Sequence, residues 1–216
     1  MRTLSLVDLM AFLEGLQWTL VLVVLSFVFG GLLGLALALL RTSNIAPVRW
    51  VASAFLQLVQ GVPLLALLMF FYFGMPVFLG VEVPSLTAVT VAFSIYSGVF
   101  LGEIWRGGIQ AVKYTQWEAA ASLGLSRWEQ FVFVIAPQAL KISLPATVGF
   151  LVQLIKGTSL ASVVGFVELT RAGQIASAAT FQQLLVYSII AAIYFAICFP
   201  LTQWSRSLEA RLNGTG

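Results

Sequence analysis

Two groups of residues in this 216-residue chain have types and spacings that could do chemistry. The first lies in a polar segment, residues 113–141, which combines Glu118, Ala119, Ala120 and Gly124 between otherwise apolar stretches. A carboxylate, a small-residue surface and a glycine in one short helix would suit docking against a soluble partner protein. The second group consists of polar side chains within apolar stretches, where they are costly and become candidates for function. Its members are Gln57, Gln60, Glu103, Gln153 and Lys156.

Catalysis by this chain alone is not expected. The sequence has no histidine, which removes histidine metal ligation and Ser-His or Cys-His catalysis. It has no G-x-x-x-x-G-K-[ST] phosphate loop, and its single cysteine, Cys198, lies in an apolar run as a core residue. We therefore predict no enzyme activity, no catalytic residue, no metal site and no cofactor in this chain. If the chain takes part in active transport, the energy must come from a partner subunit or an ion gradient.

The composition predicts an all-α membrane protein. Hydrophobic residues make up 60% of the chain and charged residues only 9%, with a mean hydropathy of +1.01, whereas a soluble domain carries roughly a quarter of its residues as charges. A bilayer core about 30 Å thick needs roughly 20 apolar residues of helix. We predict one transmembrane domain over residues 1–216, with a short helix outside the membrane at about 114–124. The five predicted spans are about 16–40, 52–79, 84–105, 130–156 and 183–205.

The distribution of Lys and Arg predicts an N-terminus outside and a C-terminus in the cytoplasm. Eight basic residues then face inward: Arg41, Arg49, Arg106, Lys113, Arg127, Lys141, Arg206 and Arg211. Only Arg2, Lys156 and Arg171 face outward. The net charge of +3 is modest and does not indicate nucleic acid as a partner. The polar segment becomes cytoplasmic, and residues 157–182 lie outside or dip back into the membrane.

The polar segment has the pattern of a helix, a sharp turn and a second helix. Spacings of three or four residues give the first helix one flat face, made by Trp117, Ala120, Ala121 and Gly124. Glu118 lies in the first turn, where it favours the helix dipole, and Gly124 can take the left-handed conformation that ends a helix. Ser126 can then cap the second helix, with Glu129 completing a capping box. The alternative is an ordinary amphipathic surface helix.

The polar residues within the spans leave alternatives open. Glu103 could bind the ammonium group of a substrate or pair with Arg106 on the same helix face. Lys156 could extend to the membrane interface. Gly61 and Pro63 could unwind the second span and expose backbone groups to a cavity, or form a packing kink.

Small residues recur at four-residue spacing in the first and third spans: Gly30, Gly34 and Ala38, then Gly98 and Gly102. Such pairs let helices approach closely in lipid. We expect them to pack within the chain rather than to form a dimer contact.

The polar segment resembles the EAA loop of importer permeases in the ATP-binding cassette superfamily, whose pattern is EAA-x3-G-x9-I-x-L-P. Here Glu118-Ala119-Ala120 is followed after three residues by Gly124 and after nine more by Val134-Ile135-Ala136-Pro137, with Val and Ala in place of Ile and Leu. The similarity continues in order over nearly the whole chain. It includes Gly61 with Pro63-Leu64-Leu65, Glu103-Ile104-Trp105-Arg106-Gly107-Gly108-Ile109-Gln110, Pro137-Gln138-Ala139-Leu140, Thr158-Ser159-Leu160 and Glu168-Leu169-Thr170-Arg171. These segments are similar to the polar-amino-acid permease family of histidine, glutamine and arginine importers.

The resemblance implies the fold of a type I ABC importer permease in a bacterial cytoplasmic (inner) membrane. Two such subunits, identical or paralogous, would form the pathway, and each would dock one ATPase that binds ATP and Mg²⁺. A soluble binding protein would deliver the amino acid from outside. The implied coupling residues are Trp117, Glu118, Ala119, Ala120, Ala121 and Gly124. The candidate substrate-pathway residues are Gln57, Gln60, Gly61, Pro63, Tyr96, Glu103 and Gln153.

Three departures from the family pattern lie near this pathway. The chain has Gln60-Gly61-Val62-Pro63 where members commonly have Arg-Gly-Thr-Pro, Tyr96 where Asn is usual, and Gly157 where an acid often follows the lysine. No single relative's substrate is therefore carried over. The rival interpretations are an oligomeric secondary transporter or channel for small polar solutes, and a membrane scaffold subunit that transports nothing.

Overall fold

The computed structural model describes residues 3–80 and 82–213, and every regular element in these ranges is a helix. The predicted all-α fold is thereby confirmed, while Arg2 lies outside the described residues. In chain order the elements are α1 (Leu6–Thr42), α2 (Ala46–Gln60), α3 (Leu64–Met69), the π-helix η1 (Phe70–Gly74), α4 (Met75–Leu79), α5 (Ser85–Ala111), α6 (Tyr114–Ser122), α7 (Arg127–Glu129), the π-helix η2 (Gln130–Ile135), α8 (Ala136–Gly157), the 3-10 helix η3 (Thr158–Val164), α9 (Leu169–Thr180) and α10 (Gln183–Asn213).

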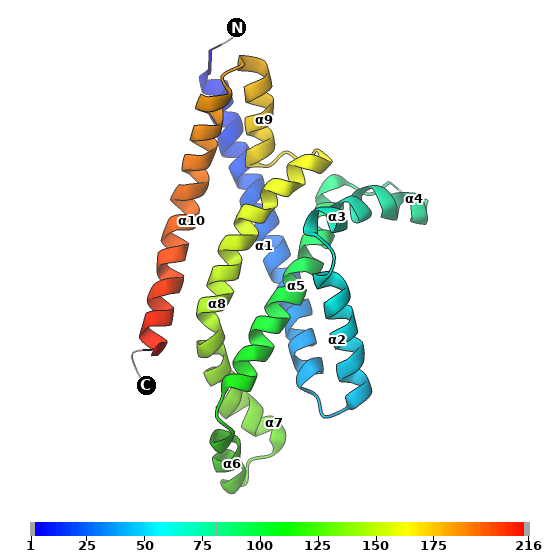
Figure 1. Ribbon diagram of the computed structural model, residues 1–216, viewed down its shortest axis with the longest axis vertical. Coiled ribbons are helices and arrows are strands. Elements are labelled where there is room, and N and C mark those ends of the chain that lie inside the picture. The colour runs from blue at the N-terminus through cyan, green and yellow to red at the C-terminus, as the bar shows by residue number, and fades with distance from the viewer. Residues whose placement is uncertain (1–2, 81, 214–216) are drawn as a thin grey trace.

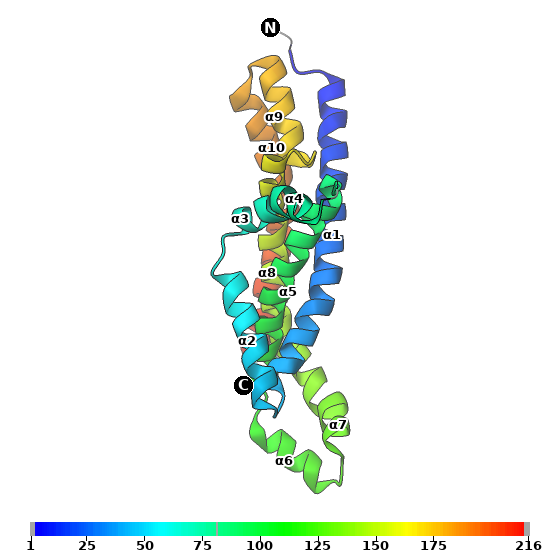
Figure 2. The same ribbon diagram turned by 90° about the vertical axis from the view of Figure 1, so that its right-hand side faces the viewer.

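The helices form an elongated bundle in which α1, α5, α8 and α10 run along the long axis (Figure 1). α9 packs against α1 and α10 near the N-terminal end, and α2 packs against α1 and α5. The short helices α6 and α7 lie at the end of the bundle opposite the N-terminus (Figure 2). The two termini therefore lie toward opposite ends of the bundle.

Within the described residues, four helical stretches are long and apolar enough to cross a membrane: residues 6–42, 85–111, 127–164 and 183–212. A fifth crossing would combine α2 with the α3–α4 segment, which is bent by 97°. The predicted second span, 52–79, is thus not one straight helix. Pro63 lacks a backbone N–H and disfavours helix at the residue before it, while its carbonyl accepts a bond of 3.1 Å from Leu67 N that starts α3. The chain therefore breaks at Gly61–Pro63, and α3 and α4 turn sideways (Figure 1).

α1 begins well before the predicted start at residue 16. Ser5 N donates to the Asp8 carboxylate at 2.9 Å, which satisfies a free donor at the helix start. With 37 residues, α1 is about 55 Å long at 1.5 Å per residue, whereas the bilayer core is about 30 Å thick. One end of α1 therefore extends beyond the hydrocarbon core.

The small residues predicted to pack within the chain do so between α1 and α5. A Cβ atom on Gly34 would lie 2.9 Å from Gly98 O, closer than real Cβ atoms approach, and 3.0 Å from Gly102 N, which is also a tight contact. A Cβ atom on Gly30 would lie 2.5 Å from the Ser97 Cβ. The prediction of intramolecular packing is confirmed, and we name this close approach the glycine contact (Gly30, Gly34, Gly98, Gly102).

Candidate functional site

The polar segment 113–141 begins as a helical hairpin whose first arm is α6. Two bonds close this arm: Leu125 N donates to Ala120 O at 3.3 Å, and Gly124 N donates to Ala121 O at 2.9 Å. Gly124 has φ +77°, the left-handed conformation that glycine adopts without strain. These bonds form a Schellman motif, so the predicted role of Gly124 in ending the helix is confirmed.

The second arm of the hairpin starts with the predicted capping box. Ser126 N donates to the Glu129 carboxylate at 2.8 Å, and Glu129 N donates to Ser126 Oγ at 3.4 Å. The backbone passes through α7 and η2 into α8, with Pro137 in the first turn of α8. Residues 127–164 together form one stretch long enough to span a membrane. The hairpin is therefore continuous with a spanning helix.

The predicted flat docking face of α6 is divided in the structure. Ala120 is buried, and Trp117 packs against the apolar cluster of Val112, Ile135 and Ala139. These two residues hold α6 against the second arm instead of facing outward. Because α6 packs against η2, a small residue at position 120 is needed for the two arms to approach.

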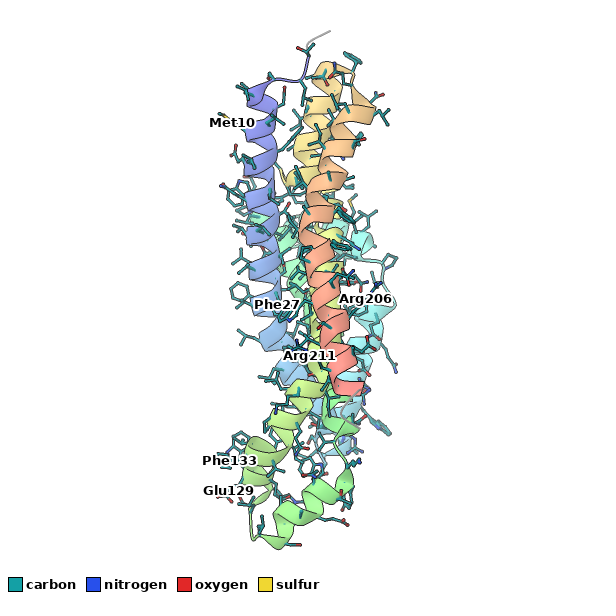
Figure 3. The ribbon with its side chains drawn as sticks, turned by 90° about the vertical axis from the view of Figure 1, so that its left-hand side faces the viewer. Met10, Phe27, Glu129, Phe133, Arg206 and Arg211 are labelled. Atoms are coloured by element: carbon teal, nitrogen blue, oxygen red, sulfur yellow. The ribbon has the colours of Figure 1, made fainter. Side chains whose placement is uncertain are left out.

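The outward surface of the hairpin includes Glu118, Ala119, Ala121 and Gly124, all of which are exposed. Within the part of the chain that the structure describes, the Glu118 carboxylate has no hydrogen bond or ion pair. Figure 3 shows Glu129 and Phe133 on the second arm of the same projecting hairpin. The hairpin thus presents an unpaired carboxylate among small residues.

A cleft of ≈ 670 Å³ lies between the hairpin and the turn that joins α1 to α2. Its lining residues are Thr42, Asn44, Tyr114, Trp117, Glu118, Ala121, Arg127, Gln130 and Phe131. A partner that contacts Glu118 would therefore also meet the α1–α2 turn.

Glu103 pairs with two arginines. Arg106 Nε donates to Glu103 Oε1 at 3.1 Å from the same helix, and Arg41 of α1 forms an ion pair with Oε2. Arg41 Nε also donates to Ser53 Oγ of α2 at 3.2 Å. Of the two alternatives for Glu103, the structure has the pairing with Arg106. The carboxylate joins α1 to α5 through Arg41, and both its oxygens are occupied.

Two of the predicted pathway residues meet in one cavity of ≈ 360 Å³ between α3, α5 and the end of α8. They are Tyr96 and Gln153, and Lys156 joins them. The cavity's lining residues are Leu64, Phe93, Tyr96, Gln153, Leu154, Lys156, Gly157, Ser159 and Leu160. Its volume lies in the roughly 300–1,000 Å³ range of small-molecule sites.

Aromatic packing fixes the position of Tyr96. Its ring centroid lies 4.6 Å from that of Phe100 and 6.2 Å from that of Phe150. Phe100 and Phe150 stack with their centroids 5.8 Å apart across the α5–α8 contact. The tyrosine is therefore held by both helices that line the cavity.

The other predicted pathway residues do not line this cavity. Gln57, Gln60, Gly61 and Pro63 are exposed at the end of α2 and in the break that follows it. The break nevertheless bears on the cavity, because Leu64, directly after Pro63, is one of its lining residues. The structure separates this group from Tyr96 and Gln153.

Glu168 is a buried acid that sequence reasoning did not single out as a site residue. Its carboxylate accepts bonds from Thr170 N at 2.9 Å, Arg171 N at 2.8 Å and the Tyr194 hydroxyl at 2.9 Å. Burial raises the pKa of Glu168, and these hydrogen bonds oppose the rise. The available signal was an acid placed to cap a short helix, here α9.

Metal binding finds no support in the described ranges. Among residues 3–80 and 82–213, no group of three or more His, Cys, Asp or Glu side chains could hold a metal ion.

Comparison with known proteins shows matches along most of the chain. A family model described as "Binding-protein-dependent transport system inner membrane component" matches residues 30–214. The chain is 36% identical over 199 residues to the probable amino-acid ABC transporter permease protein YckA of Bacillus subtilis (strain 168), covering 92% of this chain and 88% of that protein. It is 38% identical over 200 residues to the L-cystine transport system permease protein TcyB of the same organism, covering 92% and 85%.

A solved structure has the same fold. The crystal structure of an amino acid ABC transporter with histidines matches with a TM-score of 0.86 and 36% sequence identity. The match covers 97% of this chain and 100% of that chain.

Proposed function

Because this chain belongs to the family of binding-protein-dependent transport system inner membrane components, we propose that it is the membrane-spanning subunit of an ATP-driven amino acid importer. It has the fold of a type I ABC importer permease. It forms half of the translocation pathway and couples to a separate ATPase through the hairpin. The secondary-transporter and scaffold interpretations are not favoured, because the relatives that match over most of the chain are permeases of ABC transporters.

The exposed hairpin is the observation that supports the coupling proposal. It presents the Glu118 carboxylate, which has no partner among the described residues, beside Ala119, Ala121 and Gly124. The alanines let a partner's surface approach closely, and the carboxylate offers it a charge-assisted hydrogen bond. Ala120 and Trp117 keep α6 in place from the inner side.

The chain is a multi-pass protein of the inner membrane, and membership of this family implies an ATPase and a soluble binding protein as partners. We propose that a second permease, identical or paralogous, completes the pathway, and that two ATPase copies bind ATP and Mg²⁺. We also propose an outside N-terminus and a cytoplasmic C-terminus. Figure 3 supports this orientation, because Arg206 and Arg211 lie toward the hairpin end of α10 and Met10 lies at the other end of the bundle.

The test is ATP-dependent amino acid uptake by liposomes that contain the reconstituted complex with its ATPase and binding protein. Glu118→Arg reverses the charge on an exposed side chain, so membrane insertion and thermal stability should be retained. Uptake and co-purification of the ATPase should be lost. The matched control is Glu209→Arg, since Glu209 is exposed near the end of α10.

Normal uptake by the Glu118→Arg complex would disprove the coupling role of the hairpin. Uptake that needs neither ATP nor the ATPase subunit would disprove the importer function itself.

A further inference from the structure

The cavity between α3, α5 and the end of α8 contains one kind of charge. Lys156 is the single charged residue among the residues that line it, and no carboxylate lines it within the described part of the chain. The remaining polar lining side chains are neutral: Tyr96, Gln153 and Ser159. The cavity therefore has a positive group and neutral donors and acceptors.

Three polar side chains of this cavity are available to a ligand, whereas the Ser159 hydroxyl donates to Lys156 O at 2.8 Å. Among the residues that the structure describes, the side chains of Tyr96, Gln153 and Lys156 form no hydrogen bond or ion pair with one another or with other residues. They come from α5 and α8, whose aromatic contact holds the tyrosine ring in place. The cavity thus presents unpaired polar groups on a rigid, largely apolar wall, as small-molecule sites do.

Two carboxylates close to the cavity residues along the chain are already occupied: Glu103 follows Tyr96 on α5, and Glu168 follows the end of η3. Glu103 is paired with Arg41 and Arg106, and Glu168 accepts three hydrogen bonds as the cap of α9. Neither is left free to neutralise Lys156 or to receive a cationic side chain. An amino acid with a cationic side chain would bring a like charge beside Lys156, which costs free energy.

We propose that this cavity selects amino acids by charge: Lys156 binds a substrate carboxylate, and neutral or acidic amino acids are accepted over cationic ones. The α-ammonium group is received by neutral oxygen acceptors, for which the Gln153 amide and the Tyr96 hydroxyl line the same cavity. The inference rests on the proposed function and names the substrate class of that transporter.

The test is equilibrium binding of radiolabelled glutamine, glutamate and arginine to the detergent-purified permease–ATPase complex without the binding protein, so that the binding protein's own selectivity does not enter. Wild type should bind glutamine and glutamate more tightly than arginine. Lys156→Gln should weaken glutamine and glutamate binding by about tenfold or more, as expected for the loss of a hydrogen bond to a charged group. Lys141→Gln is the matched control, since Lys141 is an exposed lysine on the same helix and does not line the cavity.

A second variant tests the same idea as a gain of binding. A Cβ atom on Gly157 would lie 3.7 Å from both Leu64 Cδ2 and Phe93 Cε1, which is ordinary contact with two residues of the cavity wall. Gly157→Asp therefore adds a carboxylate beside Lys156 without a backbone clash. The ratio of arginine to glutamine affinity should rise by about tenfold, the effect of one charge-assisted bond gained.

The outcomes separate this inference from the proposed function. Tighter binding of arginine by wild type, or equal affinities for Lys156→Gln and Lys141→Gln, would overturn the charge selection while ATP-dependent uptake stands. Undetectable binding of both glutamine and glutamate by a complex that performs uptake would overturn it as well. Loss of ATP-dependent uptake by the wild-type complex would instead disprove the function on which the inference rests.

Discussion

Replacing Gly30 by alanine tests whether the glycine contact sets the distance between α1 and α5. The new Cβ atom would lie 2.5 Å from Ser97 Cβ, 2.8 Å from Ser94 O and 3.0 Å from Gly98 N. Two of these three atoms belong to the α5 backbone, so a side-chain rotation cannot relieve the overlap. The two helices would have to move apart. The next residue supplies the control, because a Cβ atom on Gly31 would meet only Trp105 Cη2, at 3.5 Å.

The expected magnitudes follow from two opposing effects. Overpacking a close contact costs about 1–3 kcal/mol, while alanine in a helix interior is favoured over glycine by about 0.5–1 kcal/mol. Gly30→Ala should therefore lower the free energy of unfolding by roughly 0–2.5 kcal/mol net, and by about 1–3 kcal/mol relative to Gly31→Ala, in which the alanine gain is the same. Gly31→Ala gains the helix preference of alanine without the overpacking, so it should leave the free energy of unfolding unchanged or raise it slightly.

The assay is thermal unfolding of the purified complex in detergent, followed by intrinsic fluorescence. One kcal/mol corresponds to roughly 2–4 °C in melting temperature for a chain of this size, so the two variants should be resolved. A Gly30→Ala protein as stable as Gly31→Ala would refute the reasoning, because it would mean that α1 and α5 separate at no cost.

Two further predictions concern the acids that the structure places in hydrogen-bond networks. Glu103→Gln should lower the melting temperature, because Arg41 and Arg106 lose their shared partner. The same variant should leave the KM for uptake near the wild-type value. A large rise in KM at unchanged stability would instead assign Glu103 to substrate binding. Burial raises the pKa of Glu168 above its ordinary value of 4.5, so the folded chain binds the carboxyl proton more tightly than the unfolded chain does. The protonated carboxyl therefore adds to the free energy of unfolding below pH 4.5, and this contribution is lost as the pH rises through the folded pKa. Glu168→Gln should flatten that decline in a series of thermal unfolding measurements from pH 4.5 upward, and an unchanged slope would contradict this.

Much of the fold follows from the apolar stretches, because lipid requires every backbone group to be satisfied within a helix. What hydropathy could not indicate is where a helix continues beyond the apolar region. α1 starts at Leu6 because Ser5 and Asp8 bond one another locally, although this first turn contains a charge. The 97° bend after α2 is the reverse case, because here the helix breaks within an apolar stretch. Gly61 and Pro63 permitted a break, but only the packing of α3 sets its angle.

The candidate sites were predictable to different degrees. The turn chemistry of Gly124 and Ser126 is local, so residue types alone indicated the hairpin. Which residues of α6 face inward depends on the second arm, and for that reason the burial of Ala120 was not foreseen. The meeting of Tyr96 with Gln153 joins two helices far apart in the sequence. Lys156 was predicted to extend to the membrane interface. Its place in the cavity depends on where α3 lies, and no spacing in the sequence predicts that position.

The hairpin and the cavity are joined by the two helices between which the hairpin is inserted. α5 carries Tyr96 at the cavity and ends at Ala111, directly before the hairpin begins. The second arm continues through η2 into α8, which carries Gln153 and Lys156 at its far end. α1 holds α5 through the glycine contact and the Arg41–Glu103 ion pair. If the hairpin couples to an ATPase as proposed, a force applied to it would reach the cavity along α8, while α5 is restrained by α1. Because the Tyr96, Phe100 and Phe150 rings bridge α5 and α8, a shift of α8 relative to α5 must rearrange the wall on which Tyr96 is held. In this arrangement a partner that moved the hairpin would change the shape of the proposed substrate site.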